Sequence, residues 1–159
     1  MTPLIVYKNV EVCQEEQIIL SDVNLTVTSG EMIYLLGRIG SGKSSFMKTI
    51  YGELPVEGMQ ATALDYDLLH LRRRDIPYLR RKVGVVFQDF QLLPDRNVEE
   101  NLMFVLKATG WKDKHAMRNN IHDVLQQVGM AEKAYKMPYQ LSGGEQQRVV
   151  IARALLNAP

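Results

Sequence analysis

The chain has 159 residues, of which 46% are hydrophobic and 23% charged, and its 19 basic and 18 acidic residues give a formal net charge of +1. This composition is typical of a globular protein large enough to bury a core, and the near-neutral charge gives no general attraction to nucleic acid or anionic lipid. A single cysteine, Cys13, excludes an internal disulfide. No run approaches the roughly 18 apolar residues that span a bilayer, and no signal-peptide pattern is present, so we expect a cytoplasmic protein.

The first part of the chain alternates strand-like and turn-like segments. Leu4–Val12 is rich in residues that favour strands, and Ile18–Val27 alternates apolar and polar residues. The short apolar run Met32–Leu36 is typical of a strand in a parallel sheet that is covered on both faces. Residues 44–51 are predicted to be helical, with Gly52 ending the helix.

The middle of the chain is less regular. Residues 53–74 show no period that predicts an element, whereas Val83–Phe87 is a second short apolar run typical of a strand. Strands and helices mixed in this way predict an α/β fold with a parallel sheet.

Helices dominate beyond Gln88. Asn97 and Glu100 have the spacing of a capping box, and Gly110 is placed to end the helix that they begin. A second helix with one apolar face is predicted to stop at Gly129, and a third to start near Ser142.

One segment carries a complete phosphate-binding motif. The pattern G-x-x-x-x-G-K-[ST] is matched at every position by Gly37, Arg38, Ile39, Gly40, Ser41, Gly42, Lys43 and Ser44, and Ser45 completes the predicted set. Glycines let backbone N–H groups curl around a polyphosphate, and the helix that follows directs its positive end at the same anion. Lys43 is expected to reach the β- and γ-phosphates and the Ser44 hydroxyl to ligate Mg²⁺. A chance match is disfavoured because a strand-like run precedes the loop and a helix follows it.

A second motif lies at Leu141–Gln147. Ser142 and Glu145 have the spacing of a capping box, so the segment can be interpreted simply as the start of a helix. Two consecutive glycines, Gly143 and Gly144, nevertheless weaken a helix. They are explained if the exposed N–H groups approach a phosphate closely.

The motifs together resemble one family. The stretch LSGGEQQR, continued by Val149–Leu155, resembles the signature of ABC ATPases, and Val86-Phe87-Gln88-Asp89 resembles the Q-loop of that family. With the P-loop, three motifs stand in the family's order. The run Ile76–Asp89, followed by Leu92–Arg96, is similar to FtsE-like cell-division ATPases, and lipoprotein-release and macrolide-export ATPases share much of this pattern.

The resemblance implies ATP and Mg²⁺ as cofactors and two kinds of partner. In ABC dimers the signature of one subunit caps the γ-phosphate held on the P-loop of the other. A second ATPase subunit is therefore implied, in a head-to-tail dimer, with four residues acting in trans: Ser142, Gly143, Gly144 and Glu145. Gln88 would contact Mg²⁺ or the attacking water. The resemblance also implies an integral membrane permease-like subunit, a place at the inner face of the cell membrane and no nucleic-acid partner.

The resemblance further implies a partial ABC ATPase domain in three parts. Residues 1–88 would form the P-loop core with its N-terminal β region, residues 89–141 a helical subdomain, and residues 142–159 the signature helix. The family's Walker B Asp, catalytic Glu and switch His come later and find no match here, so no catalytic residue is identified. We therefore expect a fragment of a longer gene product that hydrolyses ATP poorly alone. We also expect an unpaired strand edge at residues 32–36.

One family feature and two alternative functions remain open. No aromatic residue stands near Cys13-Gln14, where the family stacks a ring on adenine. The chain is favoured as the ATP-binding subunit of a membrane complex. A nucleotide-binding module without turnover is the first alternative. A soluble ABC ATPase of DNA repair or translation is the second, disfavoured by the compact helical interval after Gln88 and by the low net charge.

Overall fold

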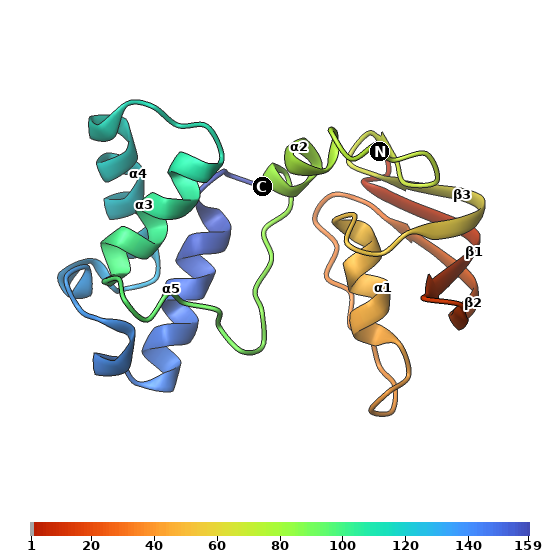
Figure 1. Ribbon diagram of the computed structural model, residues 1–159, viewed down its shortest axis with the longest axis horizontal. Helices are drawn as coiled ribbons and strands as arrows, with labels where there is room; N and C mark the ends of the chain where they lie inside the picture. The colour runs from red at the N-terminus through yellow and green to blue at the C-terminus, as the bar shows by residue number, and fades with distance from the viewer. Residues whose placement is uncertain (1) are drawn as a thin grey trace. The chain divides into compact units, whose positions relative to one another are not determined.

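The structure, a computed structural model that describes residues 2–159, divides into two compact units (Figure 1). The first unit ends at Arg80, and the second spans Arg81–Pro159. The three-part division expected from the resemblance stays a prediction. Among the described residues, no helix combines the length and the apolarity that a membrane span requires.

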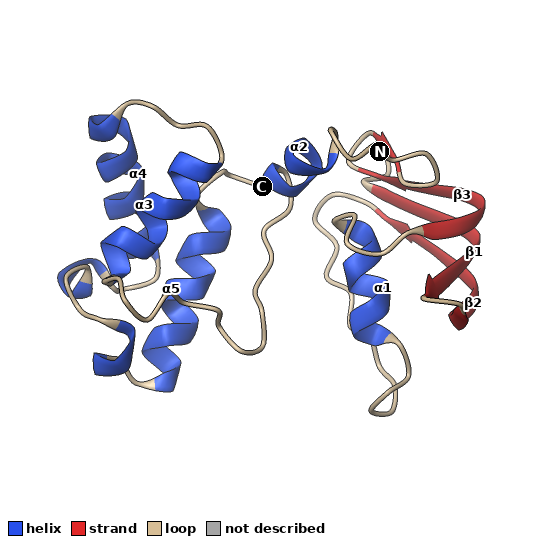
Figure 2. Ribbon diagram, viewed as in Figure 1, coloured by secondary structure: helices blue, strands red, loops and turns tan. Residues whose placement is uncertain are grey.

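The first unit contains a four-stranded antiparallel sheet in the order β2-β1-β3-β4 (Figure 2). The strands are β1 (Ile5–Gln14), β2 (Gln17–Val27), β3 (Val56–Ala63) and the short β4 (Tyr66–Asp67). The two strands predicted nearest the N-terminus are confirmed. β3 and β4 were not predicted, because their polar and small residues carry no clear alternation; β3 is held by its ladder with β1, and β4 by its ladder with β3.

Helix α1 (Lys43–Ile50) packs on this sheet and confirms the predicted helix. Its buried side chains Phe46 and Thr49 both contact Tyr7 of β1. The Tyr7 hydroxyl shares a 2.8 Å hydrogen bond with Thr49 Oγ1, and the rings of Tyr7 and Phe46 meet edge to face at 5.3 Å. Burial raises the pKa of Tyr7 to about 12. Strand β1 therefore fixes the position of the helix that follows the predicted phosphate loop.

The predicted strand at Met32–Leu36 is wrong in this structure. The segment has no strand ladder, and Met32 and Leu36 are 79% and 91% exposed. A strand exists only through hydrogen bonds to a neighbour, and none of the four strands in the described residues pairs with this segment. The apolar composition of this run is typical of a covered strand, but composition does not show whether a neighbouring strand is present to pair with it.

The second unit is helical. The short helix α2 (Ile76–Arg81) closes the first unit, and only its last residue belongs to the second. The three longer helices of the second unit are α3 (Val98–Ala108), α4 (Lys114–Gln127) and α5 (Gly143–Leu155). Single 3₁₀ turns lie at Ala131–Lys133 and Pro138–Gln140. One hydrophobic core joins the three longer helices. Its buried residues are Val98, Leu102, Leu106, Met117, Ile121, Val124, Leu125, Met130, Leu141, Val149, Ala152 and Leu156.

The helices predicted after Gln88 are confirmed. Asn97 caps α3 with the full capping box: Glu100 N donates to Asn97 Oδ1 at 2.8 Å, and Asn97 N donates to Glu100 Oε2 at 2.9 Å. The predicted strand Val83–Phe87, in contrast, is wrong for the same reason as the earlier one, because the segment joins no ladder.

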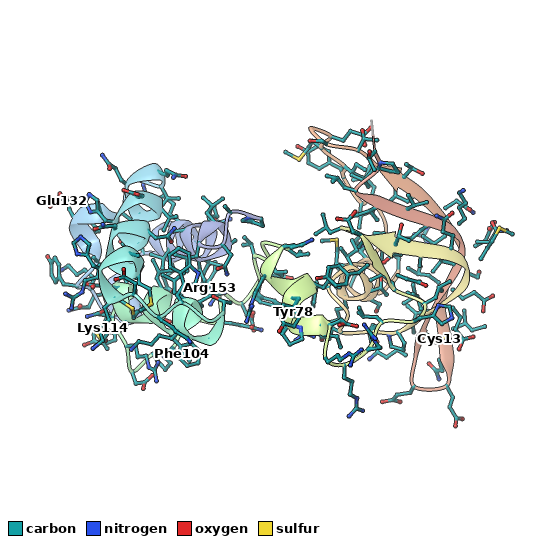
Figure 3. All side chains as sticks on the ribbon, turned by 90° about the horizontal axis from the view of Figure 1, so that it is seen from above. Cys13, Tyr78, Phe104, Lys114, Glu132 and Arg153 are labelled. Carbon is teal, nitrogen blue, oxygen red and sulfur yellow. The ribbon has the colours of Figure 1, made fainter. Side chains whose placement is uncertain are left out.

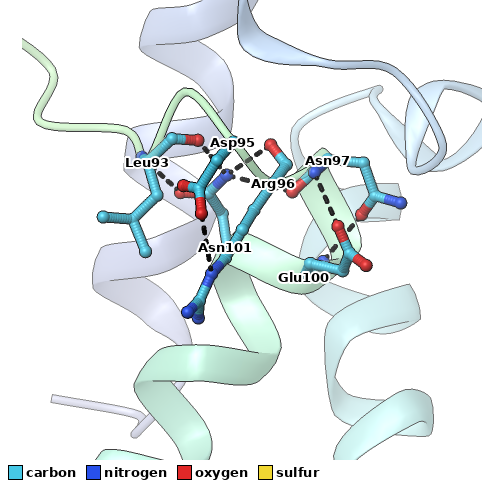
Figure 4. Close-up of polar contacts among 6 residues, drawn as sticks. All are labelled: Leu93, Asp95, Arg96, Asn97, Glu100 and Asn101. Atoms are coloured by element: carbon cyan, nitrogen blue, oxygen red, sulfur yellow. Dashed lines mark hydrogen bonds and ion pairs between the residues drawn. The ribbon is translucent and has the colours of Figure 1, made fainter.

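Asn101, a buried polar residue on α3, organises the loop that leads into this helix (Figure 4). Its Oδ1 accepts from Leu93 N at 2.8 Å, and its Nδ2 lies 3.1 Å from Leu93 O and 3.0 Å from the carbonyl oxygens of Arg96 and Asn97. The side chain therefore replaces backbone hydrogen bonds that the loop cannot make with itself.

Trp111 lies at the edge of the helical core. Its indole Nε1 donates to Asn157 Oδ1 at 3.1 Å, and the Thr109 hydroxyl lies 3.3 Å from the same oxygen. These contacts hold the C-terminal end of α5 against the turn after α3.

Candidate functional site

The predicted phosphate loop lies in the first unit and turns directly into α1. Gly42, the N-cap of α1, has φ +88, and a Cβ at this position would lie 2.9 Å from Ile19 Cγ2 and 3.0 Å from Leu20 Cδ2. A side chain here is therefore strained by the left-handed backbone and would require the side chains of Ile19 and Leu20 on β2 to shift. Gly42 also offers no side chain to cap α1, which leaves the first N–H groups of the helix facing the loop.

The rest of the loop is open. Arg38, Ile39 and Gly40 are exposed, and so is Ser41. A Cβ at Gly37 would lie 2.6 Å from Ser41 Oγ and 3.7 Å from Lys43 Nζ, so it would fill the space inside the loop. A loop kept empty by glycine and bordered by backbone N–H groups is suited to a compact anion.

The ammonium of Lys43 lies inside this loop. Its Nζ donates to Gly37 O and to Arg38 O, each at 2.7 Å, and to Ser41 Oγ at 3.3 Å. An ammonium has three donors, and all three are directed at neutral oxygens of the loop. A charged phosphate oxygen is a stronger acceptor than these carbonyls, so the arrangement places an exchangeable positive charge where an anion can be held.

Ser44 and Ser45 stand in the first turn of α1. Ser44 is exposed and Ser45 is half-buried. A hydroxyl oxygen at this place is a hard ligand of the kind that Mg²⁺ accepts. The structure therefore brings the predicted residues from Gly37 to Ser45 together at one end of one helix.

The second glycine motif begins α5 in the second unit. Ser142 is the N-cap and makes a full capping box with Glu145: Glu145 N donates to Ser142 Oγ at 3.3 Å, and Ser142 N donates to Glu145 Oε2 at 3.0 Å. The interpretation of this motif as the capped start of a helix is thus correct. It does not account for the glycines, because a Cβ at Gly143 or Gly144 would meet nothing within 4 Å.

Glu145 is held in its ionised form. Lys133 donates to its Oε1, and this hydrogen bond, followed by that from the Ser142 backbone, lowers the pKa of the carboxyl group. The carboxylate is therefore occupied in stabilising the helix start. The exposed face of the motif consists of Ser142, Gly143 and Gly144.

Gln88, the remaining predicted residue, is exposed in a turn of the second unit. The two residues after Asp89 both have left-handed backbones, with φ +60 at Phe90 and φ +49 at Gln91. This turn is not predictable from the residue types, since neither Phe90 nor Gln91 is a glycine or an asparagine.

Two side chains that organise these segments were missed by sequence reasoning. Asn101 holds the loop before α3, and Arg153 of α5 contacts the turn after Gln88. Arg153 is a polar residue inside the apolar stretch Val149–Leu155, which is the signal that could have revealed it, whereas Asn101 follows Glu99 and Glu100 and stands out by no such signal.

Comparisons with known proteins agree with the motifs. A family model described as "ABC transporter" matches residues 20–159. The chain is 39%, 44% and 42% identical to the cell division ATP-binding protein FtsE of Streptococcus pneumoniae, Bacillus subtilis and Escherichia coli. Each alignment covers 88% of this chain but only 60%, 61% and 63% of the relative, so the chain spans less than two thirds of their length.

Solved structures share the fold. The dimeric structure of MJ0796, described as a bacterial ABC transporter cassette, has a TM-score of 0.83 and 32% sequence identity, over 98% of this chain and 70% of that one. The same values hold for a post-hydrolysis state of the MJ0796 cassette bound to ADP and Pi. The predicted fold class is confirmed, although its parallel strands are not formed in the described residues. With its family model matched from residue 20 to residue 159, the chain belongs to the ABC transporter family.

Proposed function

We propose that this chain binds Mg-ATP through the loop Gly37–Ser44. The observation that carries the proposal is the Lys43 ammonium, held by the carbonyls of Gly37 and Arg38 at the uncapped start of α1. On binding, Lys43 exchanges these neutral acceptors for oxygens of the β- and γ-phosphates, and the N–H groups of α1 take the remaining charge.

The residues present fit a magnesium ion beside the phosphates. The Ser44 hydroxyl supplies one hard oxygen ligand from the first turn of α1, and the side-chain oxygen of Gln88 is proposed as a second. When bound, Mg²⁺ neutralises charge on the phosphates. This chain presents Ser44 on helix α1. The position of that helix is fixed by the hydrogen bond between its Thr49 and Tyr7 of β1.

The signature segment is proposed to act on a nucleotide held by a second subunit in a head-to-tail dimer. Ser142, Gly143 and Gly144 present a hydroxyl and the N–H groups at the start of α5, while Glu145 stabilises that start. The two glycines leave the helix start open, and no contact within residues 2–159 requires them. The dimeric structure of the MJ0796 cassette supports the association of two such subunits.

The whole protein is proposed to be an ATPase that couples ATP binding and hydrolysis to an integral membrane partner, at the cytoplasmic face of the membrane. The similarity to proteins named FtsE supports a role in cell division. The similarity to a cassette in a post-hydrolysis state with ADP and Pi supports hydrolysis as the reaction.

The test is calorimetric titration of the chain with Mg-ATP. Lys43→Ala removes the exchangeable charge, and we expect at least a roughly tenfold loss of affinity. Lys48→Ala is the matched control, because Lys48 is on the same helix but pairs with Glu53 at 2.9 Å. Equal affinity in the wild type and Lys43→Ala would reject the proposal. In the whole protein, phosphate release should likewise depend on Lys43 and not on Lys48.

A further inference from the structure

Arg153, near the C-terminal end of the signature helix α5, contacts the segment that carries Gln88. Its Nη1 donates to Gln91 O at 2.7 Å and its Nη2 donates to Phe90 O at 2.8 Å. Figure 3 labels Arg153 among the side chains of the second unit. One guanidinium therefore binds the carbonyls of two consecutive residues, 62 and 63 positions away in the sequence.

The two carbonyls belong to an unfavourable turn. Phe90 and Gln91 have φ +60 and φ +49, a backbone that non-glycine residues seldom adopt without compensation. Inside the turn, Phe90 N donates to Phe87 O at 3.2 Å and Gln91 N to Asp89 O at 2.6 Å. These short-range bonds shape the turn, and the Arg153 guanidinium adds side-chain hydrogen bonds to two of its carbonyls.

The chemistry of arginine suits this role. A guanidinium presents two parallel N–H donors in a fixed plane, whereas the ammonium of lysine is a single point of charge. Arg153 is half-buried, and this burial lowers the pKa of its guanidinium, while the nearby carboxylate of Asp89 acts in the opposite direction. Partial burial also reduces competition from water for the two carbonyls.

We propose that Arg153 is a positioning residue that sets the turn after Gln88 and thereby ties the Q-loop to the signature helix of the same chain. Helix α5 runs from Gly143 to Leu155, so a displacement at its signature end is carried along a rigid rod to Arg153 and to the turn. The contact itself is independent of the proposed function. Only its consequence for magnesium binding, through Gln88, rests on that function.

The first test is amide hydrogen exchange on the chain without nucleotide. Arg153→Gln removes the bidentate contact, and we expect the Phe90 and Gln91 amides to exchange roughly tenfold faster. The Leu93 amide is an internal control, because it donates to Asn101 Oδ1 at 2.8 Å and does not depend on Arg153. Arg118→Gln, which removes the same charge from α4, should leave all three amides unchanged.

The pattern across amides separates positioning from general stability. Faster exchange of Phe90 and Gln91 with an unchanged Leu93 amide supports the proposal. Equal acceleration along α5 and at Leu93 means that Arg153 only stabilises the unit, and unchanged Phe90 and Gln91 amides mean that it does not hold the turn; either result overturns the proposal. Should Arg153→Gln fold poorly, Arg153→Lys gives the same test, with an intermediate acceleration expected from its single donor group.

A second readout links the turn to nucleotide. Magnesium should strengthen ATP binding less in Arg153→Gln than in the wild type, by roughly three- to tenfold, while ATP binding without magnesium stays the same. An identical magnesium effect in both proteins would overturn the link between Arg153 and Gln88. Failure of the proposed function is distinguishable, because Lys43→Ala would then leave ATP binding intact whatever Arg153 does.

Discussion

The two glycine motifs of this chain differ in what requires them. Gly42, before α1, has φ +88, and an added Cβ would require the side chains of Ile19 and Leu20 to shift. Gly143 and Gly144, at the start of α5, have open space around their Cβ positions. The first glycine is demanded by the fold of the chain itself, whereas the fold does not account for the other two.

This difference separates the phosphate loop, which the chain shapes by itself, from the signature segment, whose glycines the chain does not require. The phosphate loop is shaped within the first unit, by β2 packing on Gly42 and by Lys43 bonding across the loop. The signature has a capped and stable helix start, but its glycines gain a purpose only from a group that approaches from outside the chain. Four predictions test this contrast.

The largest effect is expected for Gly42→Ala. The left-handed backbone and the contacts with β2 together should lower the free energy of unfolding by about 2–3 kcal/mol. Gly30→Ala is the control, because Gly30 also has a left-handed backbone, φ +84, but nothing lies within 4 Å of its Cβ position. It should lose only about 1–2 kcal/mol. Urea denaturation compares the two, and equal losses would show that β2 does not restrict this position.

A smaller effect is expected from alkaline pH in the first unit. Burial raises the pKa of Tyr7 from 10.0 to about 12, so its contribution to stability is complete below pH 10 and is lost as the pH approaches 12. We expect the free energy of unfolding to fall by about 1.3 kcal/mol between about pH 9 and about pH 11. Urea denaturation at both pH values measures it. Tyr7→Phe should lack this step, and an equal fall in that variant would assign the loss to other groups.

A comparable loss is expected for Ser142→Ala. The substitution removes the side-chain cap of α5, which is worth about 1 kcal/mol at an N-cap. Ser142→Asp retains an acceptor at the same place and should recover most of that stability. If alanine and aspartate give the same denaturation midpoint, the capping box does not stabilise α5.

The smallest effect, and the one of opposite sign, is expected for Gly144→Ala. Alanine favours a helix more than glycine does, and its Cβ meets nothing here, so the chain should gain about 0.5 kcal/mol. Gly129→Ala, at φ +67, should instead be destabilised. A clear loss of stability in Gly144→Ala would contradict the contrast, because the fold would then require this glycine too.

The sequence predicted the parts of the fold that are encoded locally. The capping boxes at Asn97 and Ser142 and the apolar face of α4 follow from spacing alone, and all three are confirmed. The motif at Gly37–Ser44 predicted a glycine loop at a helix start for the same reason. These features depend on residues within one or two turns of each other.

Features that depend on distant partners were not predictable in this way. The runs Met32–Leu36 and Val83–Phe87 have the composition of strands, but composition does not reveal whether a neighbour is present to form a ladder. The contact of Arg153 with Phe90 and Gln91 joins residues more than 60 positions apart. Neither periodicity nor a local motif contains that information.

The contact between Trp111 and Asn157 gives the molecule its own optical reporter. Trp111 is the only tryptophan in the sequence, and its indole N–H is bonded to a residue just beyond the last turn of α5. Indole fluorescence depends on hydrogen bonding and on the polarity around the ring. A shift of the end of α5 would change the emission of a single fluorophore, so movements of the signature helix can be followed in solution without an attached label.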